Sequence, residues 1–228
     1  MIGGNSKMKK KKTISHKLLG GHPFNAERQL KYRLATSFWS DANDFLIRVS
    51  LLRDNRPHDT KAYFAKLYVD LLMSAECALK SLIISLSKKS ETPEDAYLTA
   101  RRNSHNLDKL YKEVELRAKN RIKLLSKKEK DILLKANTIG VGFRYDITTF
   151  FFLAQEDYID RMFQDGQVSS VININFINDF YKMLHTLNDI ADKSYHKYYG
   201  KNNLLSGINL QKLKERQDAF FTTMESKL

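Results

Sequence analysis

Two histidines and two aspartates near the C-terminal end of the chain have the residue types of a metal site. His185, Asp189, Asp192 and His196 follow one another at steps of four, three and four, which places them on one side of a helix. From first to last they span about 16 Å of helix axis, so one ion cannot contact all four. The stripe also lies about 110° from the apolar face of that helix, which is typical of a solvated charged face. We therefore predict no metal site here.

Motifs for cofactors and covalent catalysis are missing from the sequence. There is no G-x-x-x-x-G-K or G-x-G-x-x-G phosphate loop and no nucleophile elbow, and Gly140-Val141-Gly142 is a lone G-x-G. Cys77 is the single cysteine, so no disulfide forms within the chain, and we expect it to be a small buried residue. No apolar run approaches the roughly 18 residues of a membrane helix. We predict a cytoplasmic protein without a cofactor or a membrane partner.

Basic residues are the chain's strongest compositional signal, with 39 Lys and Arg against 26 Asp and Glu. Lysines dominate the first 21 residues, which we interpret as a flexible tail, and the candidates there for binding a polyanion are Lys9, Lys10, Lys11 and Lys12. A plain solvated tail is the alternative. The remaining residues, 22–228, are predicted to form a single α-helical domain.

A second basic run surrounds a predicted helix junction and supplies three more candidates for nucleic-acid binding, Arg117, Arg121 and Lys123. The run is either a solvated connection or a surface that faces an anion, and its sequence does not separate the two. Basic and aromatic residues also alternate over 195–199. Inward tyrosines with lysines at a helix end explain that pattern better than stacking on bases does.

The 228 residues include few glycines and prolines and many long amphipathic runs, which predicts an all-α protein. The clearest run follows Tyr63, where apolar residues at steps of three and four form one helical stripe. Its members are Phe64, Leu67, Leu71, Ala75, Ala78, Leu82 and Leu86. The stripe narrows to alanine at its centre, where a second helix can approach closely.

Other helices are predicted from periodicity and end signals. Thr92-Pro93 and Ser126–Glu129 have the pattern of helix starts, the second as a capping box. The expected helices cover about 25–53, 60–87, 93–102, a segment opened by Ser104-His105-Asn106, 126–137, 175–199 and 209–226. In the first of them we place Ile47 and Leu51 on the apolar stripe, and in the last we expect Leu210 and Phe221 to carry part of it.

Three short segments together resemble the HEPN domains, small helical domains of prokaryotic defence and toxin–antitoxin systems. The first is Ser74-Ala75-Glu76 followed by Ala78-Leu79-Lys80-Ser81-Leu82-Ile83, and the second is Ser104-His105-Asn106-Leu107 with Leu110. The third, Gly142-Phe143-Arg144-Tyr145-Asp146, is similar to the Arg-Tyr element that opens a later helix of the family. The resemblance implies an up-down bundle of four to five long helices with short accessory helices. It also implies frequent dimers.

Ribonuclease members of that family carry an arginine followed, after four to six residues, by a histidine. After Arg144 the eligible positions are Thr149, Phe150 and Phe151, so the motif fails where the resemblance expects it. Arg53 and His58 have the spacing, but they fall in a predicted loop. Arg102, His105 and Arg144 are left as candidates for a site rebuilt across helices. We expect His105 to begin a helix and to meet free backbone N–H groups there.

Three hypotheses follow. The first is a non-catalytic HEPN-like domain that binds RNA or a protein partner as a homodimer. The second is a HEPN-type, metal-independent endoribonuclease with displaced residues, and the third is a basic helical protein that binds nucleic acid by charge. The failed motif favours the first, and we expect no robust ribonuclease activity from the isolated protein.

Overall fold

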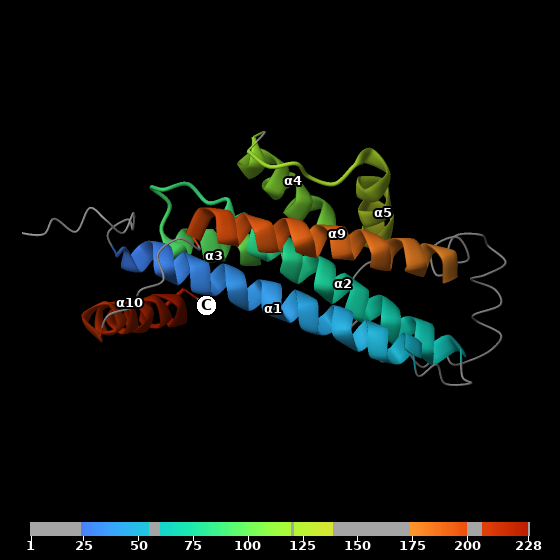
Figure 1. Ribbon diagram of the computed structural model, residues 1–228, viewed down its shortest axis with the longest axis horizontal. Coiled ribbons are helices and arrows are strands. Elements are labelled where there is room, and N and C mark those ends of the chain that lie inside the picture. The colour runs from blue at the N-terminus through green and yellow to red at the C-terminus, as the bar shows by residue number, and fades with distance from the viewer. Residues whose placement is uncertain (1–23, 55–59, 120, 139–173, 200–206, 228) are drawn as a thin grey trace, which may run out of the picture.

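The computed structural model describes residues 24–54, 60–119, 121–138, 174–199 and 207–227. Within these ranges every regular element is a helix, which confirms the predicted all-α class. The helices are α1 (Ala26–Asp54), α2 (Thr60–Ser85), α3 (Pro93–Arg102), α4 (Leu107–Ala118), α5 (Lys127–Thr138), α9 (Ile174–Tyr199) and α10 (Gly207–Glu225) (Figure 1). The predicted tail and the predictions for residues 139–173, Arg144 included, lie outside the described residues.

Three long helices, α1, α2 and α9, pack side by side as the body of the bundle (Figure 1). Arg53 at the end of α1 donates to Asn178 at the start of α9, and Tyr32 packs on Tyr195 at the other end, so these two helices are antiparallel. Lys31 donates to the carbonyl of Lys88, just beyond α2, so α2 is antiparallel to α1 as well. Consequently α2 and α9 run in the same direction.

Between α2 and α9 the described chain returns through short helices. α3, α4 and α5 have 10–12 residues each, whereas α1, α2 and α9 have 26–29 and α10 has 19. The predicted helical bundle is confirmed.

Small residues let α1 and α2 approach closely. Ser74 and Ser81 on α2 donate their hydroxyls to the carbonyls of Ala42 and Ala35 on α1, at 2.9 and 2.8 Å. Cys77 is buried, as predicted. The predicted α2 stripe is confirmed for the six members whose side chains are described, all fully buried, namely Leu67, Leu71, Ala75, Ala78, Leu82 and Leu86.

The predicted inner face of α1 is wrong at its C-terminal end. Ile47 and Leu51 are 49% and 57% exposed, and the buried positions there are Leu46 and Val49. α1 packs against both α2 and α9, so the face that it buries at this end lies between the two contacts and is centred on Leu46 and Val49. The buried face is therefore rotated from the predicted one.

The last two helices differ in how well the sequence predicted them. On α9 the helical spacing of six residues predicts one inward face, and all six are buried, namely Ile177, Phe180, Leu184, Leu187, Ala191 and Tyr195. On α10, Leu213, Phe220 and Met224 are buried in a second small core against α1 and α3, but Leu210 and Phe221 are exposed, contrary to prediction. Arg216 on α10 forms ion pairs with Glu94 on α3 and Glu27 on α1, which hold α10 against these two helices.

Candidate functional site

His105, Glu76 and Lys80 meet where the turn before α4 crosses the middle of α2. Glu76 accepts from Lys80 Nζ at 2.6 Å and from the backbone N–H of His105 at 3.2 Å, and its Oε2 lies 2.9 Å from His105 Nδ1. The Glu76 and Lys80 side chains are 6% and 10% exposed, whereas that of His105 is 39% exposed. The buried Glu76–Lys80 ion pair therefore contacts the Nδ1 edge of the His105 ring, whose side chain is partly exposed to solvent.

The electrostatics of this cluster favour the ionised carboxylate. Burial alone would raise the pKa of Glu76, but the hydrogen bond and charge of Lys80, together with His105, hold that pKa below its usual value. His105 has φ = 67°, a left-handed conformation that is uncommon for residues other than glycine. The bonds from its N–H and ring to Glu76 offset this backbone strain.

The predicted role of His105 at the start of α4 is wrong. Its ring contacts the Glu76 carboxylate instead of free N–H groups. The N–H groups of Lys109 and Leu107 are capped by the side-chain oxygens of Asn106 and Asn137, at 2.9 and 2.8 Å. These two N–H groups at the start of α4 are therefore satisfied by amide oxygens and not by the imidazole.

Of the other residues considered for catalysis, the structure describes Arg102 and Arg53. Arg102 is the last residue of α3 and is exposed. Arg53 donates to Asn178 at 2.9 Å and lies over the Tyr181 ring, at the opposite end of α1 from the start of α3. His58 and Arg144 lie outside the described residues.

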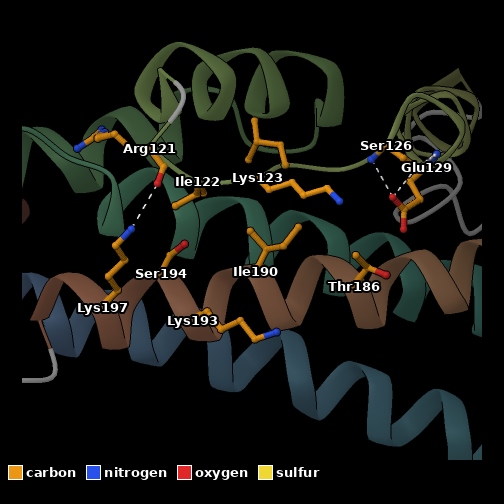
Figure 2. Close-up of a pocket in the computed structure, with 11 residues that line it drawn as sticks. Arg121, Ile122, Lys123, Ser126, Glu129, Thr186, Ile190, Lys193, Ser194 and Lys197 are labelled. Carbon is orange, nitrogen blue, oxygen red and sulfur yellow. Dashed lines mark hydrogen bonds between the residues drawn. The ribbon is translucent and has the colours of Figure 1, made fainter.

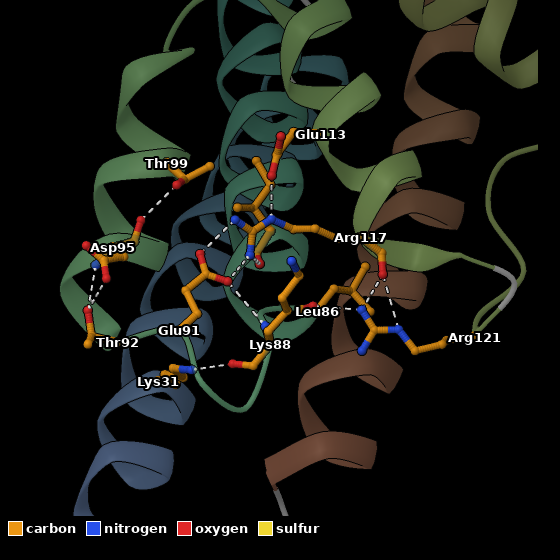
Figure 3. A network of polar contacts seen from close by, with 11 residues as sticks. Lys31, Leu86, Lys88, Glu91, Thr92, Asp95, Thr99, Glu113, Arg117 and Arg121 are labelled. Carbon is orange, nitrogen blue, oxygen red and sulfur yellow. Dashed lines mark hydrogen bonds and ion pairs between the residues drawn. The ribbon is translucent and has the colours of Figure 1, made fainter.

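Arg117 belongs to a polar network that fastens the end of α2 to α4 (Figure 3). Its guanidinium donates twice to Glu91, at 2.7 and 2.8 Å, and once to Glu113, at 2.6 Å. The same Glu91 accepts from the backbone of Lys88, and Lys31 donates to the Lys88 carbonyl. These two carboxylates neutralise Arg117, which we therefore assign a structural role.

Arg121, one helical turn further on, has different partners. Its guanidinium donates to the carbonyl oxygens of Leu86, at 2.8 Å, and Arg117 (Figure 3). These carbonyl oxygens hold the Arg121 guanidinium beyond the end of α4.

A groove of about 620 Å³ lies between segment 121–126 and α9 (Figure 2). Its charged lining residues are the cations Arg121, Lys123, Lys193 and Lys197 and the single carboxylate of Glu129. The sequence pointed to Arg121 and Lys123 from their local charge density. It gave no reason to place them opposite Lys193 and Lys197, which lie about 70 positions away in the chain.

Glu129 fixes one end of this groove. Its carboxylate accepts from the N–H of Ser126 at 2.8 Å and from the Ser126 hydroxyl at 2.6 Å, which confirms the predicted capping box. The Ser126 hydroxyl is the main reason that the pKa of Glu129 is lowered, with smaller contributions from Thr186 and the charge of Lys123. The carboxylate is therefore ionised at neutral pH.

The stripe of His185, Asp189, Asp192 and His196 faces outward along α9, as predicted, with only Asp192 half-buried. Asp192 accepts from the Tyr195 hydroxyl at 2.7 Å and lies 3.6 Å from His196 Nε2. Among the described residues, no three His, Cys, Asp or Glu side chains are grouped so that they could hold a metal ion.

No helix in the described ranges combines the length and apolarity needed to cross a bilayer. Comparisons with protein-family models, with curated proteins and with solved structures find no match to this chain.

Proposed function

We propose that this chain is a non-catalytic, HEPN-like helical protein that binds RNA in a prokaryotic defence or toxin–antitoxin context. The family assignment is supported by the resemblance of the 74–83, 104–110 and 142–146 segments, and by the all-α fold in which the first two segments meet through Glu76 and His105. RNA binding is carried by one observation. Four cationic side chains gather on a groove whose described lining has a single carboxylate.

Two lysines of the groove, Lys123 and Lys193, are better placed to meet a phosphate than Arg117 is. Arg117 already has two carboxylate partners. Lys123 and Lys193 are exposed, so a phosphate can reach them from solvent. Neutralising phosphates with such side chains releases counterions and drives binding that weakens with salt.

The test is a double charge reversal, Lys123→Glu with Lys193→Glu, and fluorescence anisotropy with a labelled single-stranded RNA. We expect roughly tenfold weaker binding and a salt slope that falls by about 0.7 for each lost phosphate contact. Lys212→Glu with Lys214→Glu is the matched control, because these exposed lysines lie on α10, which packs on α1 and α3. The single variant Lys193→Glu is measured as well, because it should also bind RNA more weakly if the double variant loses binding through charge and not through misfolding. Equal loss in both double variants would refute a specific groove.

The tail contributes a separate, sequence-independent attraction in this proposal. Deleting residues 1–20, which removes Lys9–Lys12, should flatten the salt slope further without changing which RNA is preferred. An unchanged slope would make the tail a bystander.

A displaced HEPN ribonuclease is the second candidate, and the Glu76–His105 pair is the observation in its favour. A carboxylate on Nδ1 fixes the tautomer and orientation of an imidazole, as a general base requires. RNA cleavage that is lost in His105→Ala but kept in His58→Ala would select this candidate. A basic protein outside the family predicts the same groove binding, and neighbouring genes would distinguish it.

The proposal includes a cytoplasmic homodimer. Ile47 and Leu51 lie one turn apart on α1 and are both about half exposed, so a second copy could cover them. Light scattering at tens of micromolar should give twice the chain mass. A monomer at that concentration would contradict the dimer.

A further inference from the structure

Four polar side chains join the end of α1 to the start of α9, which lie side by side (Figure 1). Ser50 and Arg53 are three positions apart on α1, and Asn178 and Tyr181 have the same spacing on α9. The Ser50 and Tyr181 hydroxyl oxygens are 2.6 Å apart, and Arg53 Nη2 donates to Asn178 Oδ1 at 2.9 Å. All four residues are half-buried, so this Arg53 cluster lies at the surface of the seam between the two helices.

The charge of Arg53 is not balanced within the cluster. Its partners in the described ranges are the amide of Asn178 and the ring of Tyr181, and both are neutral. Arg117 and Arg216, by contrast, each pair with two carboxylates. A half-buried cation has lost part of its hydration, so an anion that reaches it gains a favourable charge interaction. Arg53 therefore has the electrostatic properties of an anion site.

Two contacts hold the Arg53 guanidinium in one plane. Its central carbon lies 4.5 Å from the centre of the Tyr181 ring, and Asn178 fixes one of its nitrogens. A guanidinium has five N–H donors in a rigid fork, and Asn178 accepts from one of them. The fork matches two oxygens of a phosphate, which arginine binds through parallel hydrogen bonds. Because Arg53 is already oriented, little side-chain freedom is lost when a phosphate binds.

The Ser50–Tyr181 pair adds a neutral donor at the same place. One hydroxyl donates to the other, so the second hydroxyl keeps its own hydrogen for another acceptor. The pair lies at the end of the ring that Arg53 covers, so this hydrogen and the guanidinium are close together. His185 packs nearly perpendicular to the same ring, with centres 4.6 Å apart, and helps to hold it. The cluster therefore offers an anion a fixed cation and a hydroxyl donor.

We propose that Arg53, Ser50 and Tyr181 form a binding site for a phosphate group, carried either by RNA or by a phosphorylated small molecule. The site goes beyond the proposed function because it is separate from the groove. Tyr181 is twelve positions before Lys193 on α9, which is about 18 Å along the helix axis. Since the site uses no lysine of the groove, it binds phosphate whether or not the groove binds RNA.

The test compares the full chain with Arg53→Gln, which removes the charge but keeps an amide N–H for Asn178. One probe is a short labelled single-stranded RNA, followed by fluorescence anisotropy. The other is inorganic phosphate, followed by the rise in melting temperature relative to chloride at equal ionic strength. Arg101→Gln is the matched control, because Arg101 on α3 is exposed and lies over the Tyr97 ring, 5.9 Å from its centre.

We expect Arg53→Gln to weaken binding of the probe that carries the ligand's phosphate about tenfold, and Arg101→Gln to change it less than about twofold. Weaker RNA binding by Arg53→Gln identifies a phosphate of RNA. A lost response to inorganic phosphate with unchanged RNA binding identifies a phosphorylated small molecule. If the two variants behave alike with both probes, the proposal is overturned.

Tyr181→Phe tests the site without a change of charge. It keeps the ring beneath Arg53 and removes the hydroxyl, so the same probe should bind about threefold more weakly. Circular dichroism checks the fold of each variant, and if Arg53→Gln is unfolded, unchanged binding by Tyr181→Phe overturns the proposal. The double reversal of Lys123 and Lys193 should keep the response to inorganic phosphate. This site and the groove therefore fail in different experiments.

Discussion

Asp70 and Glu76 are both buried acids on α2, less than two turns apart, yet their pKa shifts have opposite signs. Burial raises the pKa of Asp70, and Arg48, 3.1 Å away, only partly offsets this. Burial acts on Glu76 in the same sense, but Lys80 and His105 lower its pKa overall. The carboxylates are 5% and 6% exposed, so the difference comes from their partners.

The partner of Asp70 is a surface residue. The Arg48 side chain is 61% exposed, so water screens its charge and it loses entropy when it is held in one place. Lys80 is 10% exposed, pairs with Glu76 along one helix turn, and lies over the Phe38 ring. A buried carboxylate is therefore stabilised when its cation is buried with it.

Of the variants that test this comparison, Glu76→Gln should change the free energy of unfolding the most. It leaves the Lys80 charge buried without a counter-charge and weakens the hold on the strained His105 turn, which we expect to lower the free energy of unfolding by about 3 kcal/mol. For a chain of this size the melting temperature should fall by about 6–12 °C. Glu115→Gln is the control, since it breaks a pair with Lys130 that is about one-third exposed, and it should cost less than about 1 kcal/mol.

The effect of Glu76→Gln should depend on pH. Because the folded pKa lies below the unfolded value of about 4.3, the stabilisation by Glu76 is complete above that value. It is lost as the pH falls through the folded pKa. Urea titrations at pH 7 and at pH 3 should show the wild type and Glu76→Gln converging at the lower pH. If the difference in the free energy of unfolding between the two proteins is the same at both pH values, the shape of Glu76 and not its charge accounts for its contribution to stability.

The sequence predicted what depends on local pattern. The Thr92 and Ser126 helix starts and the inward face of α9 follow from residues within a few positions of one another. The Glu76–His105 contact joins positions 29 apart, and neither the left-handed turn nor the 2.9 Å contact has a local signature. A lysine four residues after a glutamate within an apolar stripe was the available sign of a buried ion pair.

Charge density likewise predicted only part of the basic surface. Arg117 and Arg121 are both arginines in one basic run, one turn apart. Arg117 is neutralised by Glu113, one turn before it, and by Glu91, which the turn after α2 brings to it. Glu91 lies 26 positions away from Arg117, so the composition of the run does not reveal that second partner.

Asn188 extends the comparison to a buried side chain for which the described residues provide no hydrogen-bond partner. Both polar atoms of its amide are buried without a hydrogen bond, and the residue is 6% exposed. Leaving such atoms unsatisfied costs about 1–3 kcal/mol. Asn188→Leu, which is similar in volume, should therefore raise the free energy of unfolding by about 1–2 kcal/mol in urea titrations. A loss of stability would mean that the amide has a partner, such as water, that the leucine removes.

Asp70→Asn should give the smallest change in the free energy of unfolding. The change should be stabilising, whereas that of Glu76→Gln is destabilising. Because the folded pKa of Asp70 is raised, the folded state binds a proton more readily than the unfolded state does. The cost of ionising Asp70 therefore appears as the pH rises from about 3.9 through the folded pKa, and it persists at pH 7. Asparagine removes this cost and can still accept from Arg48.

We expect Asp70→Asn to raise the free energy of unfolding by about 1 kcal/mol at pH 7 and to have almost no effect at pH 3. Arg48→Ala is the complementary variant, because it removes the guanidinium that lowers the Asp70 pKa. It should raise the pH at which the ionisation cost becomes complete, while the onset stays near pH 3.9 and stability changes by less than about 1 kcal/mol. Destabilisation by Asp70→Asn at pH 7 would show that an exposed arginine suffices to stabilise a buried carboxylate, and the contrast with Glu76 would then have to come from the His105 turn.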